Sequence, residues 1–396
     1  MRAVKGRGGK VQKENEVLYF DHAATSWPKP QAVLDAVMSA MQHESANPGR
    51  GSHRMAVKAS RVLFGGRRSL AKLFGIRNPN DIAFTLNTTA ALNVAIKGFL
   101  KPGDHVIATA VEHNSVRRPL TYIREHGVEV SYVDTDEHGE LDAAMVESAI
   151  RPHTALIIVN HSSNLLGSIL PVADIGEVAR RHGVRLLVDA AQSAGVLDID
   201  VEAMGIDMLA FPGHKALLGP QGTGGLYLHP ELDLEPLLHG GTGSQSEAEG
   251  QPDIRPDRYE AGTPNTPGIA GLRAGVETIL DVGTARIRAH ERELTLRLMD
   301  GLQALKGLRI LGPPAGRPRT GIVSFVASEV DPSELAFILD QHYGIAVRAG
   351  YHCTPLAHGQ AGTSSTGAVR ASVGWTSTTD EVDAFIAAMK EIMKHY

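Results

Sequence analysis

The sequence predicts an α/β protein with a large domain around a mostly parallel sheet and a smaller C-terminal α+β domain. Short apolar runs alternate with helical patterns through the first two thirds of the chain, and this alternation is typical of a parallel sheet. Runs such as "LIIV" and "LLV" are apolar on both alternating faces, as expected for strands that helices cover on both sides. Near the C-terminus the pattern changes to that of a compact α+β unit.

In the first part of the chain, two amphipathic helices are expected at residues 31–43 and 56–74, because apolar side chains recur there at helical spacing. Short strands are then expected at the segments "DIAFTL", "DHVIATA", "VEVSYVD", "TALIIVN", "RLLVDAA" and "DMLAFPG". The segments "GTGG" (222–225) and "GGTGS" (240–244) lack the strand–glycine–helix context of a phosphate loop, so we interpret them as turns.

A long helical pattern from Gly268 to about Leu305 leads out of the alternating region and is expected to bridge two domains. Beyond it, strands are expected at "GIVSFVAS", "IAVRAG" and "AVRASVG", and helices at "PSELAFILDQHY" and "TDEVDAFIAAMKEIMKHY". We therefore expect three parts: an N-terminal segment (1–30) that packs on the small domain, a large domain (31–267), and a linker helix with the small domain (268–396).

The composition excludes several classes of function. The 396 residues include 39 Lys and Arg against 44 Asp and Glu, for a net charge of -5, so we expect no nucleic acid partner. No segment approaches the ~18–20 consecutive apolar residues of a membrane span. One cysteine cannot form an intramolecular disulfide, and the polar, basic N-terminus lacks the apolar run of a secretory signal. We expect a cytoplasmic protein and assign no metal site.

Two pairs of polar residues follow strands of the expected sheet. Asp189 and Gln192 follow "LLV", and His214 and Lys215 follow "AFPG". Ligands bind at the carboxyl edge of open parallel sheets. A lysine there can form a Schiff base with an aldehyde cofactor, and a carboxylate facing a pyridine nitrogen keeps it protonated, which together favour pyridoxal phosphate. The alternatives are a solvated loop lysine and a helix-capping aspartate.

A phosphate group would need its own binding site, and "LNTTAALN" supplies one. Thr88 and Thr89 open an expected helix, whose free N–H groups favour an anion. Simple N-capping explains the same residues equally well. His113 in "EHNS" follows another strand, where an imidazole can stack on a cofactor ring, although an ordinary core or surface histidine is the commoner outcome.

Several motifs in a fixed order resemble a known family. They are "DHAAT" (21–25), "NTTAALN" (87–93), "EHNS" (112–115), "SSNLLG" (162–167), "VDAAQ" (188–192), "GHK" (213–215), "EAGTPN" (260–265) and "RAGYHC" (348–353). Together they resemble the class V aminotransferase family, in its cysteine desulfurase and selenocysteine lyase branch, from about Tyr19 onward. The resemblance implies the fold type I of pyridoxal phosphate-dependent transferases, with a seven-stranded sheet.

The resemblance implies a set of side chains around pyridoxal phosphate. Lys215 is expected to carry the cofactor and act in catalysis, with Asp189 at the pyridine nitrogen and a catalytic His113 stacked on the ring. Gln192 is expected to contact the ring hydroxyl, and Asn164 is also expected to contact the cofactor. Thr88, Thr89 and His214 are expected to bind the phosphate. Many relatives carry Ser or Thr two residues before that histidine, whereas Pro212 offers no donor here.

Further roles follow from the same resemblance. Asn164 and Arg370 are expected to hold the substrate carboxylate, because the planar fork of arginine suits two parallel hydrogen bonds. Arg348 and His53 are also expected to bind substrate. Thr263 is expected to reach the phosphate of the neighbouring subunit, which implies a homodimer.

The single cysteine, Cys353, is the expected nucleophile. Arg348, Gly350 and Cys353 reproduce the pattern R-x-G-x-x-C of the desulfurase branch, with the short spacing of its group II. A thiolate is the species that can take sulfur from the substrate, and Arg348 and His352 are expected to favour that form. The alternative is a buried cysteine that acts as a small apolar side chain.

The leading hypothesis is a cysteine desulfurase that converts L-cysteine to L-alanine and forms a persulfide on Cys353 for transfer to an acceptor protein, for example in iron–sulfur cluster assembly. L-Selenocysteine is a second expected substrate. One alternative keeps the cofactor but changes the reaction, to a C–S lyase giving pyruvate, an aminotransferase or a decarboxylating enzyme. Another is a non-catalytic cofactor-binding or sulfur-carrier scaffold that acts through partner contacts.

Overall fold

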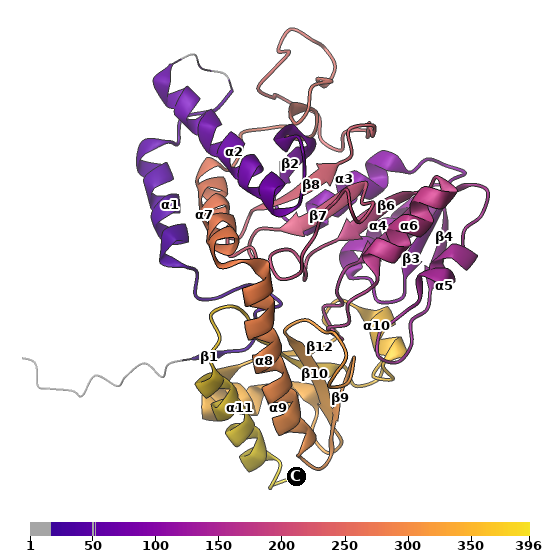
Figure 1. The fold of residues 1–396 in the computed structure, drawn as a ribbon, viewed down its shortest axis with the longest axis vertical. Helices are drawn as coiled ribbons and strands as arrows, with labels where there is room; N and C mark the ends of the chain where they lie inside the picture. Colours follow the sequence, from indigo (N-terminus) through magenta and orange to yellow (C-terminus); the bar gives the residue numbers. More distant parts are fainter. Residues whose placement is uncertain (1–16, 50, 52) are drawn as a thin grey trace, which may run out of the picture.

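The computed structural model describes residues 17–49, 51 and 53–396. The large domain forms the upper part of the molecule in Figure 1 and the small domain the lower part, with helix α8 running between them. In the large domain the seven-stranded sheet has the order β2-β8-β7-β6-β5-β3-β4. Its strands are β2 (Ile82–Thr85), β3 (His105–Thr109), β4 (Glu129–Val133), β5 (Thr154–Asn160), β6 (Arg185–Asp189), β7 (Met208–Pro212) and β8 (Gly224–Leu228). The expected seven-stranded, mostly parallel sheet is confirmed.

Strand β8 corrects the interpretation of "GTGG" as a turn. It begins at Gly224 and pairs antiparallel with both β7 and β2. A Cβ atom at Gly225 would lie 2.5 Å from the ring of Phe211. Glycine therefore gives the ring room at this position, which local sequence patterns do not reveal.

Helices cover both faces of the sheet, and the strand residues alternate between two cores. Ile107 of β3 packs with one face, whereas Val106 and Ala108 pack with the other. The first face is covered by α2 (Arg54–Leu73), α6 (Val172–His182) and α7 (Thr266–Val282), and the second by α3 (Thr88–Phe99) and α4 (Asn114–Arg124). Two more helices, α1 (Gln31–His43) and α5 (Ala143–Ser148), pack on α7 and α6, and short 3-10 helices lie at Pro79–Asp81 and Asp257–Tyr259.

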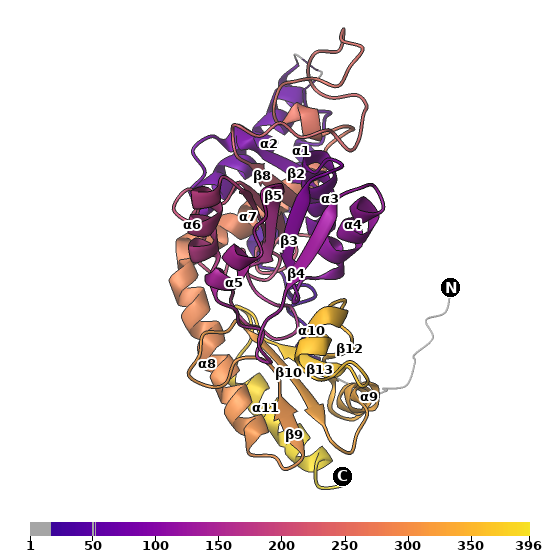
Figure 2. The ribbon, with the colours of Figure 1, turned by 90° about the vertical axis from the view of Figure 1, so that its right-hand side faces the viewer.

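The long helix expected from residue 268 onward is two helices. Helix α7 ends at Val282 and α8 (Thr284–Gln303) begins directly after Gly283, which has φ 86° and ψ 132°. This left-handed φ favours glycine and breaks the helical hydrogen bonding. Helix α8 then follows a new direction into the small domain (Figure 2).

The small domain has an antiparallel sheet of order β12-β13-β10-β9, and α8 packs on it together with α9 and α11. The strands are β9 (Leu308–Ile310), β10 (Ile322–Ala327), β12 (Arg348–Gly350) and β13 (Ala368–Ser372), and the helices are α9 (Pro332–Tyr343), α10 (Pro355–Gln360) and α11 (Thr379–Ile392). Strand β9 lay in a stretch where we expected no element. The segment "IAVRAG", expected as one strand, is divided into β11 (Ile345–Ala346) and β12.

The N-terminal segment contacts both domains. Strand β1 (Leu18–Tyr19) pairs with β11, and Asp21 forms a bridge with Ser372 of β13. Farther along, Ser26 and Lys29 donate hydrogen bonds to the backbone carbonyl of His214. Residues 1–16 of the expected segment 1–30 lie outside the described residues.

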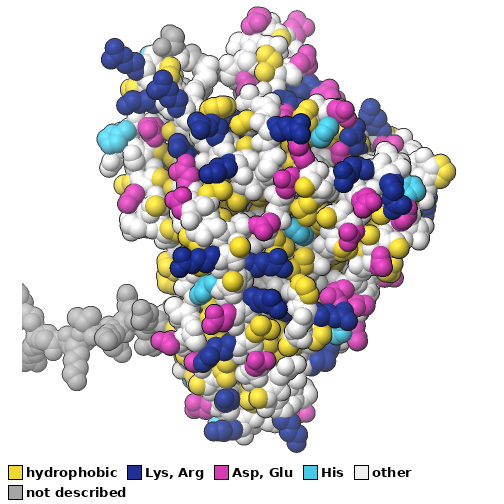
Figure 3. All heavy atoms as spheres, viewed as in Figure 1, with side chains coloured by type: hydrophobic (Ala, Val, Ile, Leu, Met, Phe, Trp, Pro, Cys, Tyr) yellow, Lys and Arg dark blue, Asp and Glu magenta, His cyan; other side chains and the backbone are white. Residues whose placement is uncertain are grey.

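The surface carries charges of both signs. On the face seen in Figure 3, Lys and Arg side chains are interspersed with Asp and Glu. Among the helices of the described residues, none is both long enough and apolar enough to cross a membrane.

Candidate active site

The carboxyl ends of the parallel strands border a pocket. Strand β6 ends at Asp189 and β7 at Pro212, and the N-terminus of α3 faces the same space. The residues that line the pocket come from the strand ends, loops and helix N-termini at this sheet edge: Asn87, Thr88, Thr89, His113, Ser115, Asn160, Ser162, Asn164, Asp189, Ala191, Gln192, Pro212, His214 and Lys215. The eight residues expected at the cofactor within one chain all line it, Thr88 and Lys215 among them.

Lys215 and Asp189 are the basic and the acidic side chain of the pocket, and each affects the pKa of the other. Burial lowers the pKa of Lys215 to about 8, against the opposing effect of the Asp189 carboxylate. Burial likewise raises the pKa of Asp189. The Ala191 N–H donates to Oδ1 of Asp189 at 2.9 Å, and this hydrogen bond and the charge of Lys215 both lower that pKa. Near neutral pH the lysine therefore has a larger fraction of free amine than an ordinary lysine, and the free amine is the form that attacks an aldehyde.

His113 is the N-cap of α4, and its Nδ1 accepts a hydrogen bond from the Ser115 N–H at 3.0 Å. Burial, reinforced by Lys215 and nearby arginines, lowers its pKa to about 4. The imidazole is therefore neutral and suited to stacking on an aromatic ring. The Ser115 hydroxyl lies 2.7 Å from the hydroxyl of Thr89. We assigned Ser115 no role, although it stands in the "EHNS" motif.

One part of the pocket is suited to an anion. Two of its buried polar atoms, Thr88 Oγ1 and His214 Nδ1, have no hydrogen-bond partner among the described residues. Asn87 caps α3 by accepting from the Ala90 N–H, and Thr88 and Thr89 of the same helix end line the pocket. The N-terminus of a helix has free N–H groups that favour an anion. Unpaired buried polar atoms are costly, so this end fits a ligand with oxygen atoms such as a phosphate.

Arg370 lies behind the pocket wall and is 1% exposed. Its Nη2 donates to Asp21 at 2.8 Å and its Nη1 to the backbone carbonyl of Asn164 at 2.9 Å, while Nε has no partner in the part of the chain described. The Oδ1 of Asn164 is likewise buried and unpaired among those residues. The fork of Arg370 is thus partly occupied by the protein itself.

Cys353 lies on a turn that contacts the pocket directly. Asn164, a pocket residue, donates from Nδ2 to the carbonyl of His352 at 2.7 Å, and the Asn114 N–H donates to the carbonyl of Cys353 at 2.8 Å. Nη2 of Arg348 lies 3.8 Å from Sγ of Cys353. The turn is therefore held against the wall of the Lys215 pocket by residues of the large domain.

His352 does not play the role expected from the sequence. It is 2% exposed, and burial lowers its pKa to about 3. A neutral imidazole supplies no positive charge to a thiolate, so Arg348 alone of the two expected residues is a cation beside the sulfur. Sequence position gives no sign of how deeply His352 is buried.

The sequence and the fold of this chain are similar to those of known proteins. The sequence profile of the family Aminotransferase class-V matches residues 18–385. A probable cysteine desulfurase from Methanothermobacter thermautotrophicus is 37% identical over 95% of this chain and 94% of its own length. An apo cysteine desulfurase structure from Thermococcus onnurineus NA1 has a TM-score of 0.91 at 36% identity, covering 96% of each chain. A cysteine desulfurase structure from Escherichia coli has a TM-score of 0.85 at 28% identity, covering 96% of this chain and 95% of that one.

The chain belongs to the class V aminotransferase family. Its relatives place it in the cysteine desulfurase branch, as the motifs predicted. Enzymes of this family depend on pyridoxal phosphate.

Two expected site residues of this class V protein lie away from Lys215. His53 is exposed, and it caps α2 by accepting from the Ala56 N–H. Thr263 is also exposed and lines a separate recess beside the buried ion pair of Arg67 and Glu260. Within the described residues of one chain, neither lines the Lys215 pocket.

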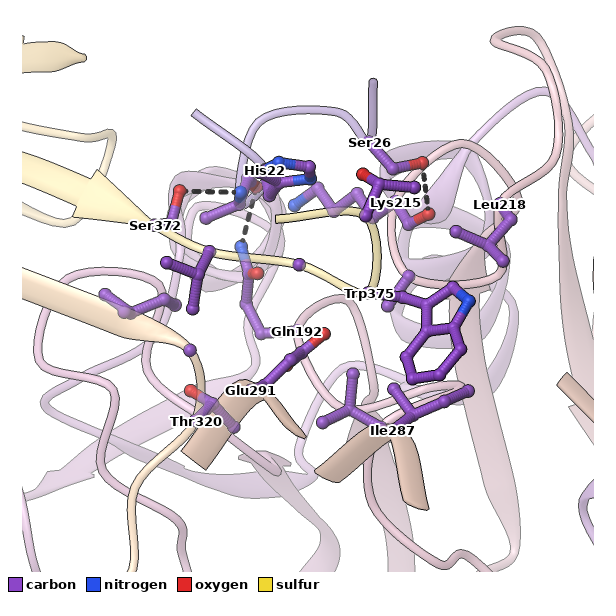
Figure 4. Close-up of a pocket in the computed structure, with 18 of the residues that line it drawn as sticks. His22, Ser26, Gln192, Lys215, Leu218, Ile287, Glu291, Thr320, Ser372 and Trp375 are labelled. Atoms are coloured by element: carbon purple, nitrogen blue, oxygen red, sulfur yellow. Dashed lines mark hydrogen bonds between the residues drawn. The ribbon is translucent and has the colours of Figure 1, made fainter. Parts of the chain in front are cut away.

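A second cavity adjoins the site and shares Lys215 and Gln192 with it. Figure 4 shows it between the N-terminal segment, the Lys215 loop and the first half of α8. Gln192 donates to the carbonyl of Ala23 at 3.0 Å, and Ser26 donates to that of Lys215 at 2.8 Å. Glu291 of α8 lines the cavity, and burial raises its pKa to about 8. Reasoning from motifs did not identify Glu291, because no motif surrounds it.

Proposed function

We propose that this class V protein is a cysteine desulfurase that converts L-cysteine to L-alanine and keeps the sulfur as a persulfide on Cys353. The observation that carries the proposal is the contact between the pocket and the cysteine turn, the 2.7 Å hydrogen bond from Asn164 to the carbonyl of His352. A lysine with free amine and a cysteine held at the same pocket wall are the two groups that this reaction requires.

The residues present fit pyridoxal phosphate. Lys215 would bind the aldehyde carbon, and Asp189 would contact the pyridine nitrogen. The neutral His113 would stack on the face of the ring. Gln192 would meet the ring hydroxyl, while Thr88 Oγ1 and His214 Nδ1, both unpaired among the described residues, would meet the phosphate. When bound, the cofactor draws electrons from the α-carbon of the amino acid. Pro212 adds no donor to this set.

Each protein group then has one task. Lys215, with a pKa lowered to about 8, can hold or release a proton near neutral pH and so moves the substrate's α-proton. Sγ of Cys353 takes the substrate sulfur: the substrate C–S bond breaks, an S–S bond forms, and the two hydrogen atoms needed by the new methyl group and the persulfide come from the two thiols. Cysteine and thiol thus give alanine and persulfide without an external oxidant.

The substrate carboxylate would meet Asn164 and the Nε–H of Arg370, with Arg348 beside the thiol. The exposed positions of His53 and Thr263 support a homodimer in which these residues serve the neighbouring subunit's pocket. A sulfur-acceptor protein, a cytoplasmic location and a role in iron–sulfur cluster assembly are part of the same proposal.

The test is to incubate the purified protein, with pyridoxal phosphate bound, with L-cysteine and to quantify alanine, pyruvate and protein-bound sulfur together. We expect alanine and bound sulfur in equal amounts in the first turnover. Cys353→Ala should bind the cofactor normally and form neither product. Pyruvate as the main product, or full sulfur transfer by Cys353→Ala, would refute the proposal. L-Selenocysteine, tested in parallel, is expected to be a second substrate.

A further inference from the structure

Lys29 is a partly buried ammonium held against the backbone of the Lys215 loop. Its Nζ donates to the carbonyl of His214 at 2.7 Å and to the hydroxyl of Ser26 at 2.7 Å. Within the described residues no carboxylate forms an ion pair with it, and burial lowers its pKa to about 8. A cation that has lost water without gaining a countercharge is destabilised. An anion near Lys29 would therefore be favourable.

The carbonyl of His214 is held by three residues of the N-terminal segment. Besides Lys29, the Thr25 hydroxyl donates to it at 3.0 Å and the Ser26 N–H at 3.1 Å. The Ser26 hydroxyl donates to the next carbonyl, that of Lys215, at 2.8 Å. These three residues do not themselves line the Lys215 pocket, but they fix the backbone from which the imidazole of His214 reaches it.

Apart from Lys215, the residues that line the pocket supply no positive charge. His214 and His113 both have pKa values that burial lowers to about 4, so both rings are neutral. Lys215 itself is the group that would bind the aldehyde of the cofactor. The charge of Lys29 acts on the ring of His214, because it contributes to the lowered pKa of that imidazole. Lys29 is therefore a cation within electrostatic reach of a side chain that would meet the phosphate.

We propose that Lys29 is a positioning residue for the phosphate group of the cofactor: it fixes His214 through the backbone carbonyl, and its ammonium supplies the positive charge that the phosphate-binding part of the pocket lacks. The inference rests on the cofactor assignment within the proposed function, but not on the reaction. Because coupling between two binding equilibria is reciprocal, a phosphate that gains from the charge of Lys29 must stabilise that charge in return. The role can therefore be measured from both sides.

The first measurement compares pyridoxal phosphate with pyridoxal, which lacks the phosphate. The dissociation constant of pyridoxal divided by that of pyridoxal phosphate, measured with cofactor-free full-length protein, isolates the contribution of the phosphate group. Lys29→Met removes the charge and keeps the length of the side chain. It should lower this ratio roughly five-fold, as expected for one charge acting through a partly buried medium. Lys29→Arg keeps the charge and should keep most of the ratio.

Ser26→Ala is the matched control, because the Ser26 hydroxyl contacts the carbonyls of His214 and Lys215 without a charge. A general loosening of the Lys215 loop would weaken the binding of both ligands alike. Ser26→Ala should therefore change the two dissociation constants by equal factors and leave their ratio as in the wild type. An unchanged ratio in Lys29→Met, or an equal fall of the ratio in Ser26→Ala, would overturn the role of the charge.

The second measurement uses only the wild type and does not depend on the folding of a variant. Unprotonated amines are the ones that react with acetic anhydride, so a phosphate that stabilises the ammonium of Lys29 should slow acetylation there. We expect Lys29 to be acetylated several-fold more slowly in protein saturated with pyridoxal phosphate than with pyridoxal, as read by peptide mass spectrometry. Lys101, which is exposed beyond the C-terminal end of α3, should react equally in both forms.

Equal acetylation of Lys29 in the two forms would overturn the proposal. A wild type that shows the expected difference at Lys29 but makes no alanine from L-cysteine would instead refute the proposed reaction and uphold the role of Lys29.

Discussion

Nη2 of Arg348 lies 3.8 Å from Sγ of Cys353. Arg348 is the first residue of β12, and Cys353 follows it by five positions, beyond the end of the strand. Since His352 is neutral, Arg348 is the cation in direct contact with the sulfur. The positive charge at the nucleophile therefore comes from a strand residue, whose backbone is fixed by pairing with Arg370.

The first prediction concerns this contact. Arg348→Gln removes the cation beside the sulfur and should slow persulfide formation roughly ten-fold at saturating L-cysteine, which corresponds to the loss of one hydrogen bond to a charged group. Arg348→Lys retains a charge and should lose less. Bound sulfur is measured in single turnovers, with cofactor absorbance as the control. Equal rates for wild type and Arg348→Gln would mean that the guanidinium does not assist the thiolate.

The second prediction concerns the anion end of the pocket. Thr88 Oγ1 has no partner in the described chain, whereas Thr89 Oγ1 lies 2.7 Å from the Ser115 hydroxyl. Thr88→Val should therefore weaken pyridoxal phosphate binding about ten-fold, the value of one hydrogen bond. Binding of pyridoxal, which lacks the phosphate, should hardly change. Thr89→Val is the matched variant and should lose less, because the Thr89 hydroxyl already has a partner in Ser115. Unchanged binding of pyridoxal phosphate by Thr88→Val would show that Thr88 does not contact the phosphate.

The third prediction uses the pKa of Lys215, which burial lowers to about 8. Only the unprotonated amine attacks an aldehyde, so covalent uptake of pyridoxal by cofactor-free protein should rise with pH through about 8. Borohydride trapping followed by intact mass measures this uptake, and Lys215→Ala gives the background. Because the Asp189 carboxylate raises the lysine pKa, Asp189→Asn should move the midpoint to lower pH. A midpoint above 10 in the wild type would contradict the buried environment described for Lys215.

Much of the fold could be predicted because its signals are local. The continuous apolar runs of β5 and β6 and the helical spacing of α1 and α9 each lie within one segment of the sequence. Strand β8 escaped prediction because its two leading glycines have low strand propensity. What makes it a strand is its pairing with β7 and the room that Gly225 leaves for Phe211. Such contacts join distant segments and leave no periodic pattern.

In the candidate site, too, the residues that lie in local motifs could be predicted, and those whose properties depend on distant segments could not. Lys215, Asp189 and His113 follow strands in recognisable motifs, and these strands end at one sheet edge, so their convergence in one pocket could be expected. The neutral state of His352 depends on burial by other segments, which no motif encodes. The same is true of Glu291, whose cavity forms only where α8, the N-terminal segment and the Lys215 loop meet.

The fourth prediction concerns the stability of the protein as a function of pH. Burial raises the pKa of Glu291 from 4.5 to about 8, so the folded chain retains a proton that the unfolded chain releases. Stability should therefore fall as pH rises from about 4.5 to about 8 and change little from this group above that range. His22, whose pKa burial lowers to about 4, and Lys215 line the same cavity.

Glu291→Gln removes this titration while retaining the size and polarity of the side chain. Its melting temperature should match that of the wild type near pH 5 and exceed it increasingly up to pH 8. Burial also raises the pKa of Glu112 to about 8, but Glu112 is present in both proteins and cancels in the difference. Scanning calorimetry of the two proteins between pH 5 and 9 measures the effect. A difference that is constant across this range would mean that Glu291 is already ionised in the folded protein, and that its cavity holds enough water or countercharge to solvate a carboxylate beside Lys215.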